Sequence, residues 1–458
     1  MRLTSTLTGE KTEFTPHNPP NVLMYVCGVT PYSDSHVGHG MSYVIFDVVR
    51  RYLAHRGYNV RVVQNFTDVD DKIIARSQET GETAEELAGR YMDLFKEDME
   101  LLNVLPADEY PLATVEVPSM LEMIKGLIDR GYAYAADGDV YFRVGKFETY
   151  GKLSHRTLDG MMAGARIAPN ELKESPLDFT LWKGAKEGEP AWDSPWGPGR
   201  PGWHIECSAM SLSYLGEKID IHGGGADLIF PHHENEIAQT EAFTGTEPFA
   251  QYWLHNGLLQ MGEEKMSKSL GNLVSIRDVV EQHGADAFRM FVLTSHYRMP
   301  LTWTDEGMAA SARAAERLSR AAGAVGGEGN APDVGAFKER FYEAMDDDIN
   351  TPQALAALFD MAREINRAAG EGGDVSDATG LLRELAGVLG LGLEQAGSGG
   401  TGDIAPFVEL LVETRAALRK EKQFALADNL RDRLAELGVV LEDTPRGTEW
   451  RIERRGGE

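Results

Sequence analysis

Two short strings in this sequence carry side chains suited to binding phosphate groups. One begins at His36 and reads His-Val-Gly-His, and the other begins at Lys265 and reads Lys-Met-Ser-Lys-Ser. Lysine ammonium groups neutralise phosphate oxygens, and a helix that begins at the histidines would add free N–H groups that favour anions. This arrangement suits attack of a carboxylate on the α-phosphate of ATP, with release of pyrophosphate. The alternative is a histidine pair on a helix and a solvated lysine loop.

The string at Lys265 lies between Gly262 and Gly271, which would let it close over ATP. Asp227 follows a run of three glycines and is a candidate to bind the ribose hydroxyls, with an ordinary helix N-cap as the alternative. The residues predicted to bind ATP are His36, Gly38, His39, Asp227, Lys265, Ser267 and Lys268, and those predicted to be catalytic are His36, His39, Lys265 and Lys268.

A third group of residues has the donor types of a metal site. If a helix starts after Pro231, His232 and Glu236 lie one turn apart on one face, whereas His233 and Glu236 form a poorer pair. The two cysteines of the chain are too few for a disulfide framework. Sulfur, nitrogen and oxygen donors in one tetrahedral shell suit zinc better than magnesium or calcium. The candidate zinc ligands are Cys27, Cys207, His232 and Glu236. The alternative is two buried structural cysteines and a solvated helix start.

The hydrophobic pattern predicts an α/β fold with a Rossmann-type parallel sheet. Residues 21–26 are typical of a buried strand, residues 41–53 repeat apolar side chains at helical spacing, and residues 59–63 predict a second strand. Such strand–helix–strand units are parallel and right-handed, and their ligands bind beyond the carboxyl ends of the strands. Cys27, Thr67 and His222 follow or end three different predicted strands, so we expect them at one edge of the sheet.

Changes in composition along the chain predict six segments. Helices rich in alanine, arginine and glutamate replace the α/β pattern after residue 302, and a glycine-rich stretch follows them. The segments are the first half of the catalytic domain (1–118), an insertion (119–197), the second half of the catalytic domain (198–301), a helical domain (302–391), a flexible linker (392–405) and a C-terminal module (406–458).

Length and composition are those of a large enzyme with several domains. The chain has 458 residues, of which 42% are hydrophobic. It contains no run of about 18 apolar residues and no signal sequence at Met1, so we expect a cytoplasmic protein that does not span a membrane. The net charge of -27 excludes a broad basic surface, so a nucleic acid would have to be bound by local patches.

Six strings in the chain are long enough to be specific. They are Y-V-C-G (25–28), N-F-T-D-V-D-D-K (65–72), G-W-H-I-E-C-S-A-M (202–210), D-I-H-G-G-G (220–225), P-H-H-E-N-E (231–236) and K-M-S-K-S (265–269). From about Met24 to the C-terminus the chain resembles the cysteinyl-tRNA synthetase family. The two phosphate-binding strings resemble the nucleotide-binding motifs of class I aminoacyl-tRNA synthetases.

This resemblance implies roles for individual residues. It implies that one zinc ion, which receives the substrate thiolate, is held by Cys27, Cys207, His232 and Glu236. It also implies that Trp203 closes over the substrate, with a core residue as the alternative, and that Thr67 and His222 lie in the substrate pocket. A metal binds a thiol far more readily than an alcohol, and would therefore separate cysteine from serine where shape alone does not.

One departure from the family follows Cys27, where the chain reads Gly-Val-Thr-Pro-Tyr instead of the usual Gly-Pro-Thr-Val-Tyr; Val37 also replaces the usual isoleucine. This order resembles the sister enzymes that join cysteine to an aminosugar in mycothiol synthesis through the same adenylate. Residues 341–355 and 415–450 instead resemble the helical, tRNA-binding and anticodon-side regions of the synthetase. The resemblance thus implies a monomer that uses ATP with Mg²⁺, L-cysteine and tRNA(Cys). The alternatives are the aminosugar ligase and a non-catalytic tRNA-binding paralogue.

Overall fold

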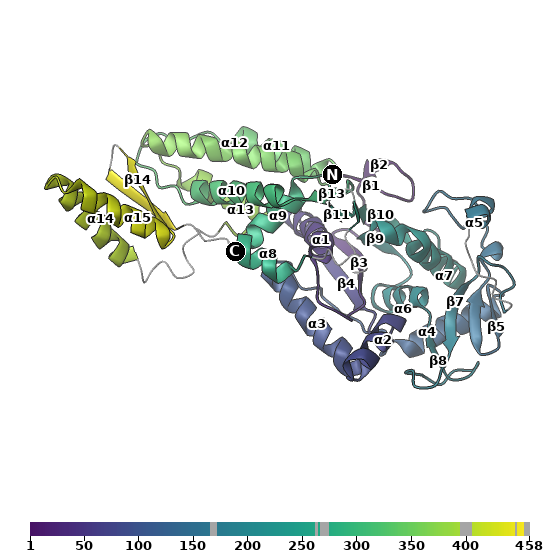
Figure 1. The fold of residues 1–458 in the computed structure, drawn as a ribbon. Coiled ribbons are helices and arrows are strands. Elements are labelled where there is room, and N and C mark those ends of the chain that lie inside the picture. The colour runs from purple at the N-terminus through teal and green to yellow at the C-terminus, as the bar shows by residue number, and fades with distance from the viewer. Residues whose placement is uncertain (165–171, 262–263, 266–273, 394–404, 445–446, 453–458) are drawn as a thin grey trace.

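The computed structural model describes residues 1–164, 172–261, 264–265, 274–393, 405–444 and 447–452. In Figure 1 a parallel sheet lies near the centre of an elongated molecule, with a second sheet on one side and a group of long helices on the other. Strands and helices alternate through the central region, so the predicted α/β class is confirmed. Within the described ranges, no helix is long and apolar enough to cross a membrane.

Four parallel strands form the central sheet in the order β10-β9-β3-β4. They are β3 (Asn21–Val29), β4 (Asn59–Phe66), β9 (Ile219–Gly225) and β10 (Ala250–Asn256). β3 and β4 run past their predicted ends, because Val29 still pairs with Phe66 beyond an irregularity in the register. β3 pairs with both β4 and β9, and residue 27 therefore lies in the interior of the sheet.

Side chains of β3 alternate between two hydrophobic cores, as the two-residue period of a strand requires. Val26 packs in the core that includes α1 (Val37–His55). Cys27 points to the opposite face, into the core formed with α6 (Trp203–Leu215) and α7 (Glu234–Thr244). The strand therefore delivers Cys27 to the face covered by the two helices that carry two of the other predicted metal ligands.

A second, antiparallel sheet of order β5-β6-β7-β8 lies mainly within the insertion. The elements from β4 to this sheet are α2 (Asp71–Thr80), α3 (Ala84–Leu101), α4 (Val117–Asp129), β5 (Ala133–Ala136), β6 (Asp139–Phe142), α5 (Leu158–Gly164), β7 (Phe179–Gly184) and β8 (Gly199–Pro201). β8 pairs with β7, so this sheet extends past residue 197, where the insertion was predicted to end.

A small sheet of order β12-β11-β13 connects the catalytic domain to the helices that follow. Its strands are β11 (Leu259–Met261), β12 (Glu264–Lys265) and β13 (Leu301–Trp303), and α8 (Ile276–His283) and α9 (Ala285–Leu293) lie between β12 and β13 in sequence. The predicted boundary between residues 301 and 302 falls inside β13, which pairs with β11. This strand therefore belongs to the catalytic side of the boundary.

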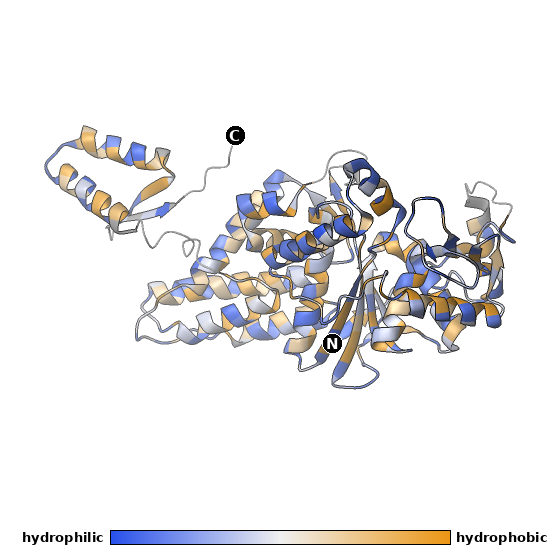
Figure 2. Cartoon of the chain, turned by 90° about the horizontal axis from the view of Figure 1, so that it is seen from below, coloured by the Kyte–Doolittle hydropathy of each residue, from blue (hydrophilic) through white to orange (hydrophobic). Residues whose placement is uncertain are grey.

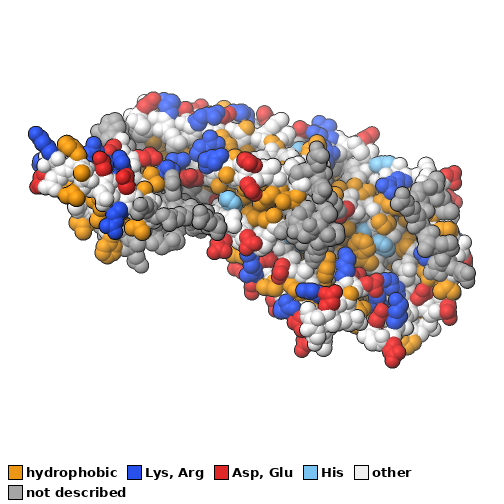
Figure 3. Space-filling view, viewed as in Figure 1, with side chains coloured by type: hydrophobic (Ala, Val, Ile, Leu, Met, Phe, Trp, Pro, Cys, Tyr) orange, Lys and Arg blue, Asp and Glu red, His pale blue; other side chains and the backbone are white. Residues whose placement is uncertain are grey.

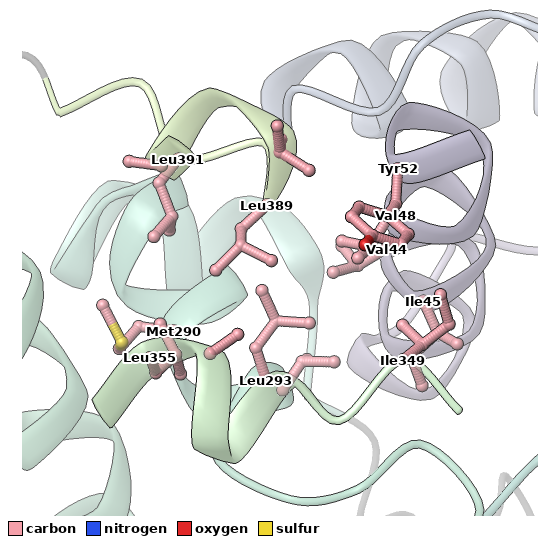
Figure 4. Close-up of a cluster of buried hydrophobic side chains, with 14 of the residues drawn as sticks. Val44, Ile45, Val48, Tyr52, Met290, Leu293, Ile349, Leu355, Leu389 and Leu391 are labelled. Atoms are coloured by element: carbon pink, nitrogen blue, oxygen red, sulfur yellow. The ribbon is translucent and has the colours of Figure 1, made fainter. Parts of the chain in front are cut away.

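The helical domain packs directly on α1. Its helices are α10 (Asp305–Ala322), α11 (Gly335–Asp346), α12 (Thr351–Gly370) and α13 (Ser376–Val388). In Figure 4, Val48 of α1 lies opposite Leu293 of α9 and Leu389, which follows α13, and all three are buried in one core. The N-terminal strands β1 (Arg2–Thr4) and β2 (Lys11–Glu13) form a hairpin beside this joint.

The C-terminal module consists of α14 (Ala405–Lys420), α15 (Phe424–Glu436), β14 (Val439–Thr444) and β15 (Gly447–Ile452). In Figure 2 its helices show hydrophobic and hydrophilic sides. Its own small core is built around Val408, Leu434 and Val439. The predicted linker, residues 392–405, falls mostly outside the described residues.

Candidate active site

Three elements and one helical turn bring the predicted metal ligands together. Cys27 comes from β3, Cys207 from α6 and Glu236 from α7, while His232 lies in the helical turn that precedes α7. That turn places His232 and Glu236 on one face, as the spacing predicted. All four side chains are buried, and we call them the four-donor cluster.

Donor atoms of the four-donor cluster all lie within 4.8 Å of one another. Glu236 Oε1 is 3.0 Å from His232 Nε2 and 3.5 Å from Cys27 Sγ. The two sulfur atoms are 3.7 Å apart. Two sulfurs, one imidazole nitrogen and one carboxylate oxygen from buried, converging side chains fit a single zinc ion.

A second donor set shares two members with this cluster. His222 Nε2 lies 2.8 Å from Glu236 Oε2, and His233 Nε2 lies 3.2 Å from Cys27 Sγ. Cys27, His222, His233 and Glu236 thus also converge. However, His233 Nε2 is 3.9 Å from Glu236 Oε1, against 3.0 Å for His232 Nε2. We favour the set with both cysteines, because its softer donors have the stronger preference for zinc.

In the four-donor cluster, the electrostatics favour the metal-binding charge state of Cys207 and Glu236, whereas Cys27 and His232 favour their protonated forms. A hydrogen bond from Cys27 lowers the pKa of the Cys207 thiol to about 6, while burial raises the pKa of Cys27. Burial alone would raise the pKa of Glu236, but His222 and His232 outweigh it and the pKa is lowered. Burial opposes a charge on His232, yet Glu236 and Cys207 raise its pKa to about 10. A metal cation would replace this proton.

The predicted substrate residues contact the four-donor cluster directly, as His222 and Trp203 do, or through Asn65, as Thr67 does. Thr67 is buried just after β4, and its hydroxyl donates a 2.8 Å hydrogen bond to Glu206 Oε2. Trp203 begins α6 and is 42% exposed, and its ring stacks on that of His232 with the centroids 4.3 Å apart. Because of this exposure, Trp203 is not a core residue, which was the alternative interpretation. We call the cluster, with Thr67, Trp203 and His222, the cysteine pocket, after the substrate that the resemblance of the sequence implies.

The two histidines predicted to bind ATP cap the start of α1. His36 Nδ1 accepts a 3.1 Å hydrogen bond from Gly38 N, and His39 Nδ1 lies 3.4 Å from His36 N. A Cβ at residue 38 would lie 2.9 Å from the His36 ring, so glycine is what allows the ring to fold back. Because α1 follows the carboxyl end of β3, its N-terminus faces the sheet edge at which ligands of such folds bind.

The remaining ATP residues are placed only in part. Asp227 is exposed in a single-turn 3-10 helix, Ala226–Leu228, directly after β9, and it is not the N-cap of a longer helix. The backbone of Lys265 lies in β12. Among the residues predicted to bind ATP and the glycines that flank the lysine string, Gly262, Ser267, Lys268 and Gly271 fall outside the described residues.

Four further residues, which no predicted role had marked, line the same region: Asn65, His204, Glu206 and His255. His204 Nδ1 lies 2.9 Å from His232 Nδ1, and His255 Nε2 lies 2.8 Å from His233 Nδ1. The first three stand inside the strings at residues 65–72 and 202–210, and those strings were the signal available in the sequence. His255 stands in no such string, so only the fold identifies it.

Family models match three successive parts of the chain. Residues 13–313 match the tRNA synthetases class I (C) catalytic domain. Residues 340–394 match the DALR domain, and residues 401–451 match the cysteinyl-tRNA ligase anticodon binding domain. The matches follow one another in the order of the sheet region, the helical domain and the C-terminal module.

Known proteins agree with these matches. A cysteine–tRNA ligase of Dehalococcoides mccartyi is 56% identical over 99% of this chain and 100% of its own, and one of Thioalkalivibrio sulfidiphilus is 52% identical over 98% and 99%. In fold, the chain is similar to methionyl-tRNA synthetase of Mycobacterium tuberculosis in complex with methionyl-adenylate, with a TM-score of 0.59, 19% identity and coverage of 81% and 88%. The chain therefore belongs to the cysteine–tRNA ligase family of class I tRNA synthetases.

Proposed function

We propose that this protein activates L-cysteine with ATP and joins it to tRNA(Cys). In the first step the cysteine carboxylate attacks the α-phosphate and pyrophosphate leaves, which gives cysteinyl adenylate. In the second step a ribose hydroxyl of the tRNA attacks the carbonyl carbon and AMP leaves. The convergence of four metal-binding side chains in a member of this ligase family carries the proposal. Since ribosomes use charged tRNA in the cytoplasm, we propose that the protein works there.

We propose that the four-donor cluster holds one zinc ion. When bound, zinc supplies a preference for a thiol over an alcohol, whereas shape alone separates cysteine from serine by only ~1 to 3 kcal/mol. The chain itself orients the substrate. Glu206 holds the Thr67 hydroxyl in place, and Trp203 covers the pocket from the solvent side.

We propose that the N-terminus of α1 and the lysine string bind ATP with Mg²⁺. His36 and His39 would exchange their capping bonds for phosphate oxygens, and Gly38 permits close approach of the backbone. The charges of Lys265 and Lys268, with the Ser267 hydroxyl, stabilise the departing pyrophosphate. Asp227 is exposed at the same sheet edge and would bind the ribose.

We propose that the helical domain and the C-terminal module bind the tRNA. Arg415, one of the basic residues of this module, is excluded from that role, because its side chain is 4% exposed and pairs with Asp443 at 2.8 Å. The exposed basic side chains Lys420, Lys422 and Arg433 remain as candidates. Figure 3 shows positive and negative side chains interspersed over one face, which agrees with contact through local patches.

Cysteine-driven exchange of pyrophosphate into ATP tests the activation step. We expect exchange with cysteine and, at equal concentration, at least about a hundredfold less with serine, because a metal prefers a thiolate to an alcohol. No exchange with cysteine would favour the non-catalytic paralogue. Equal exchange with both amino acids would show that a metal does not determine the preference for cysteine over serine.

Ending the chain after residue 397 should separate activation from transfer. Cysteine-dependent exchange should stay within about twofold of the full chain, since the cysteine pocket and the ATP residues all lie earlier in the sequence. Transfer to tRNA should fall by roughly a hundredfold or more, because a second binding module is lost. Full charging by the shortened chain would show that the C-terminal module does not bind tRNA, and would strengthen the case for the aminosugar acceptor.

A further inference from the structure

A chain of hydrogen bonds leads from the four-donor cluster to the N-terminus of the protein. His233 Nε2 lies 3.2 Å from Cys27 Sγ, and His233 Nδ1 lies 2.8 Å from His255 Nε2. On its other side, His255 Nδ1 lies 2.8 Å from Thr6 Oγ1. Both imidazoles are buried, so their polar partners are fixed by the fold.

The backbone around Thr6 is held on both sides. Thr6 N donates to Trp253 O at 2.8 Å, and Trp253 N donates to Ser5 Oγ at 3.1 Å, which fastens the segment along β10. The carbonyl of Thr6 lies 3.0 Å from Nε2 of His155, which comes from the insertion. Thr6 therefore has a defined position relative to His255.

The segment is also anchored to the helical domain two residues earlier. Asp348 is buried between α11 and α12, and its carboxylate accepts hydrogen bonds from Thr4 N and Thr4 Oγ1, both at 2.8 Å. The same carboxylate pairs with Arg298 at 2.9 Å and accepts a 3.1 Å bond from the Tyr297 hydroxyl. These contacts place Thr4, and with it Thr6, at the joint between two domains.

The direction of this hydrogen-bond chain determines what His233 presents to Cys27. Each ring nitrogen in this chain faces one partner: His233 lies between Cys27 and His255, and His255 lies between His233 and Thr6. Each neutral ring has one N–H and one lone pair. If the Thr6 hydroxyl donates to His255 Nδ1, then His255 donates through Nε2 to His233, and His233 points an N–H at the sulfur. In the reverse direction, in which His255 donates to the Thr6 hydroxyl, His233 points a lone pair at the sulfur.

We propose that Thr6 is a positioning residue of the cysteine pocket, whose hydroxyl fixes the orientation of His255 and, through it, of His233 against Cys27. Asp348 holds the segment in register through Thr4. The inference rests on the proposed function, because it assumes that cysteine binds in this pocket. Thr6 precedes residues 13–313, which match the catalytic-domain model, so its role follows from the fold alone.

Thr6→Val tests this role, since valine keeps the shape of threonine and removes the hydroxyl. In equilibrium dialysis with radiolabelled cysteine and no ATP, we expect the dissociation constant to rise about tenfold, the size of effect typical of a lost orienting hydrogen bond behind a metal site. In exchange assays the KM for cysteine should rise by a similar factor, while the KM for ATP stays within about twofold of that of the unchanged protein. A general loss of folded protein would lower the active fraction, but it would not raise the KM for cysteine while leaving the KM for ATP unchanged.

Two matched variants complete this test. Thr6→Ser keeps the hydroxyl and should bind cysteine within about twofold of the unchanged protein. Thr8→Val alters a nearby exposed threonine, whose hydroxyl accepts a 3.2 Å bond from Glu10 N, and should also leave cysteine binding unchanged. If Thr6→Val does not fold, Thr6→Ala removes the same hydroxyl with less bulk and carries the same expectation.

The anchor is tested separately by Asp348→Asn, with Asp347→Asn as its control. Asp348→Asn should weaken cysteine binding in the same direction as Thr6→Val, whereas Asp347 is half exposed and pairs with Lys11, so its variant should not. Unchanged cysteine binding in Asp348→Asn would show that Asp348 does not hold the segment in place for cysteine binding. If Thr6→Val binds cysteine as well as the unchanged protein does, the role of Thr6 is overturned and the proposed function stands. Absence of cysteine binding in the unchanged protein would overturn the proposed function itself.

Discussion

Cys207→Ser is expected to cost the protein both its metal and its activation of cysteine. Cys207 is buried, its Sγ lies 3.7 Å from Cys27 Sγ, and its pKa is lowered to about 6, so the wild-type thiol is ready to bind a cation as thiolate. A serine hydroxyl does not ionise in this range and is a poor zinc ligand. We expect about one zinc per chain in the unchanged protein and roughly a tenth of that or less in the variant.

Metal content by mass spectrometry and cysteine-dependent exchange should fall together in this variant. Ser211→Ala is the matched control, because Ser211 lies one turn further along α6 and its hydroxyl donates to Ser208 O. It should keep both zinc and exchange. A metal-free sample with full cysteine-dependent exchange would contradict the assignment of the four-donor cluster.

Lys268→Ala is expected to slow formation of the adenylate by roughly a hundredfold or more while changing the dissociation constant of cysteine little. Negative charge builds on the departing pyrophosphate in the transition state, and the ammonium group of Lys268 would stabilise that charge more than it stabilises bound ATP. Single-turnover formation of adenylate, compared with equilibrium binding of cysteine, measures the two effects separately.

Lys186→Ala removes the same charge from an exposed position and serves as the control for this variant. Its activation rate should equal that of the unchanged protein. If Lys268→Ala activated cysteine at the normal rate, this lysine would have no part in the reaction, and stabilisation of pyrophosphate would have to come from Lys265, Ser267 and the histidines at α1.

The sequence predicted those parts of the site that depend on local periodicity. Alternation along β3 sends Cys27 to one face, and helical spacing puts His232 and Glu236 together, so both could be read from residue order. The central strands were predicted for the same reason, although their ends were not. β3 and β4 continue because they pair with each other, and such pairing depends on residues far away in the sequence.

The parts that could not be predicted are long-range contacts between ordinary residues. Nothing near His255 or Thr6 in the sequence indicates that their side chains meet. Arg415 shows the opposite case, because a basic residue in the segment that resembles the anticodon-side region is a natural candidate to bind RNA, whereas the fold pairs it with Asp443. In both cases the partner comes from a different element, so composition and spacing carry no signal for the contact.

Transfer of radiolabelled cysteine to tRNA, compared with transfer to glucosaminyl-inositol, tests the central claim most directly. Both acceptors use the same adenylate, so the comparison depends only on which nucleophile the protein accepts. With ATP and Mg²⁺ present, we expect label on tRNA that is lost when either tRNA or ATP is left out, and no label on the sugar. Label on glucosaminyl-inositol with none on tRNA would contradict the proposed function.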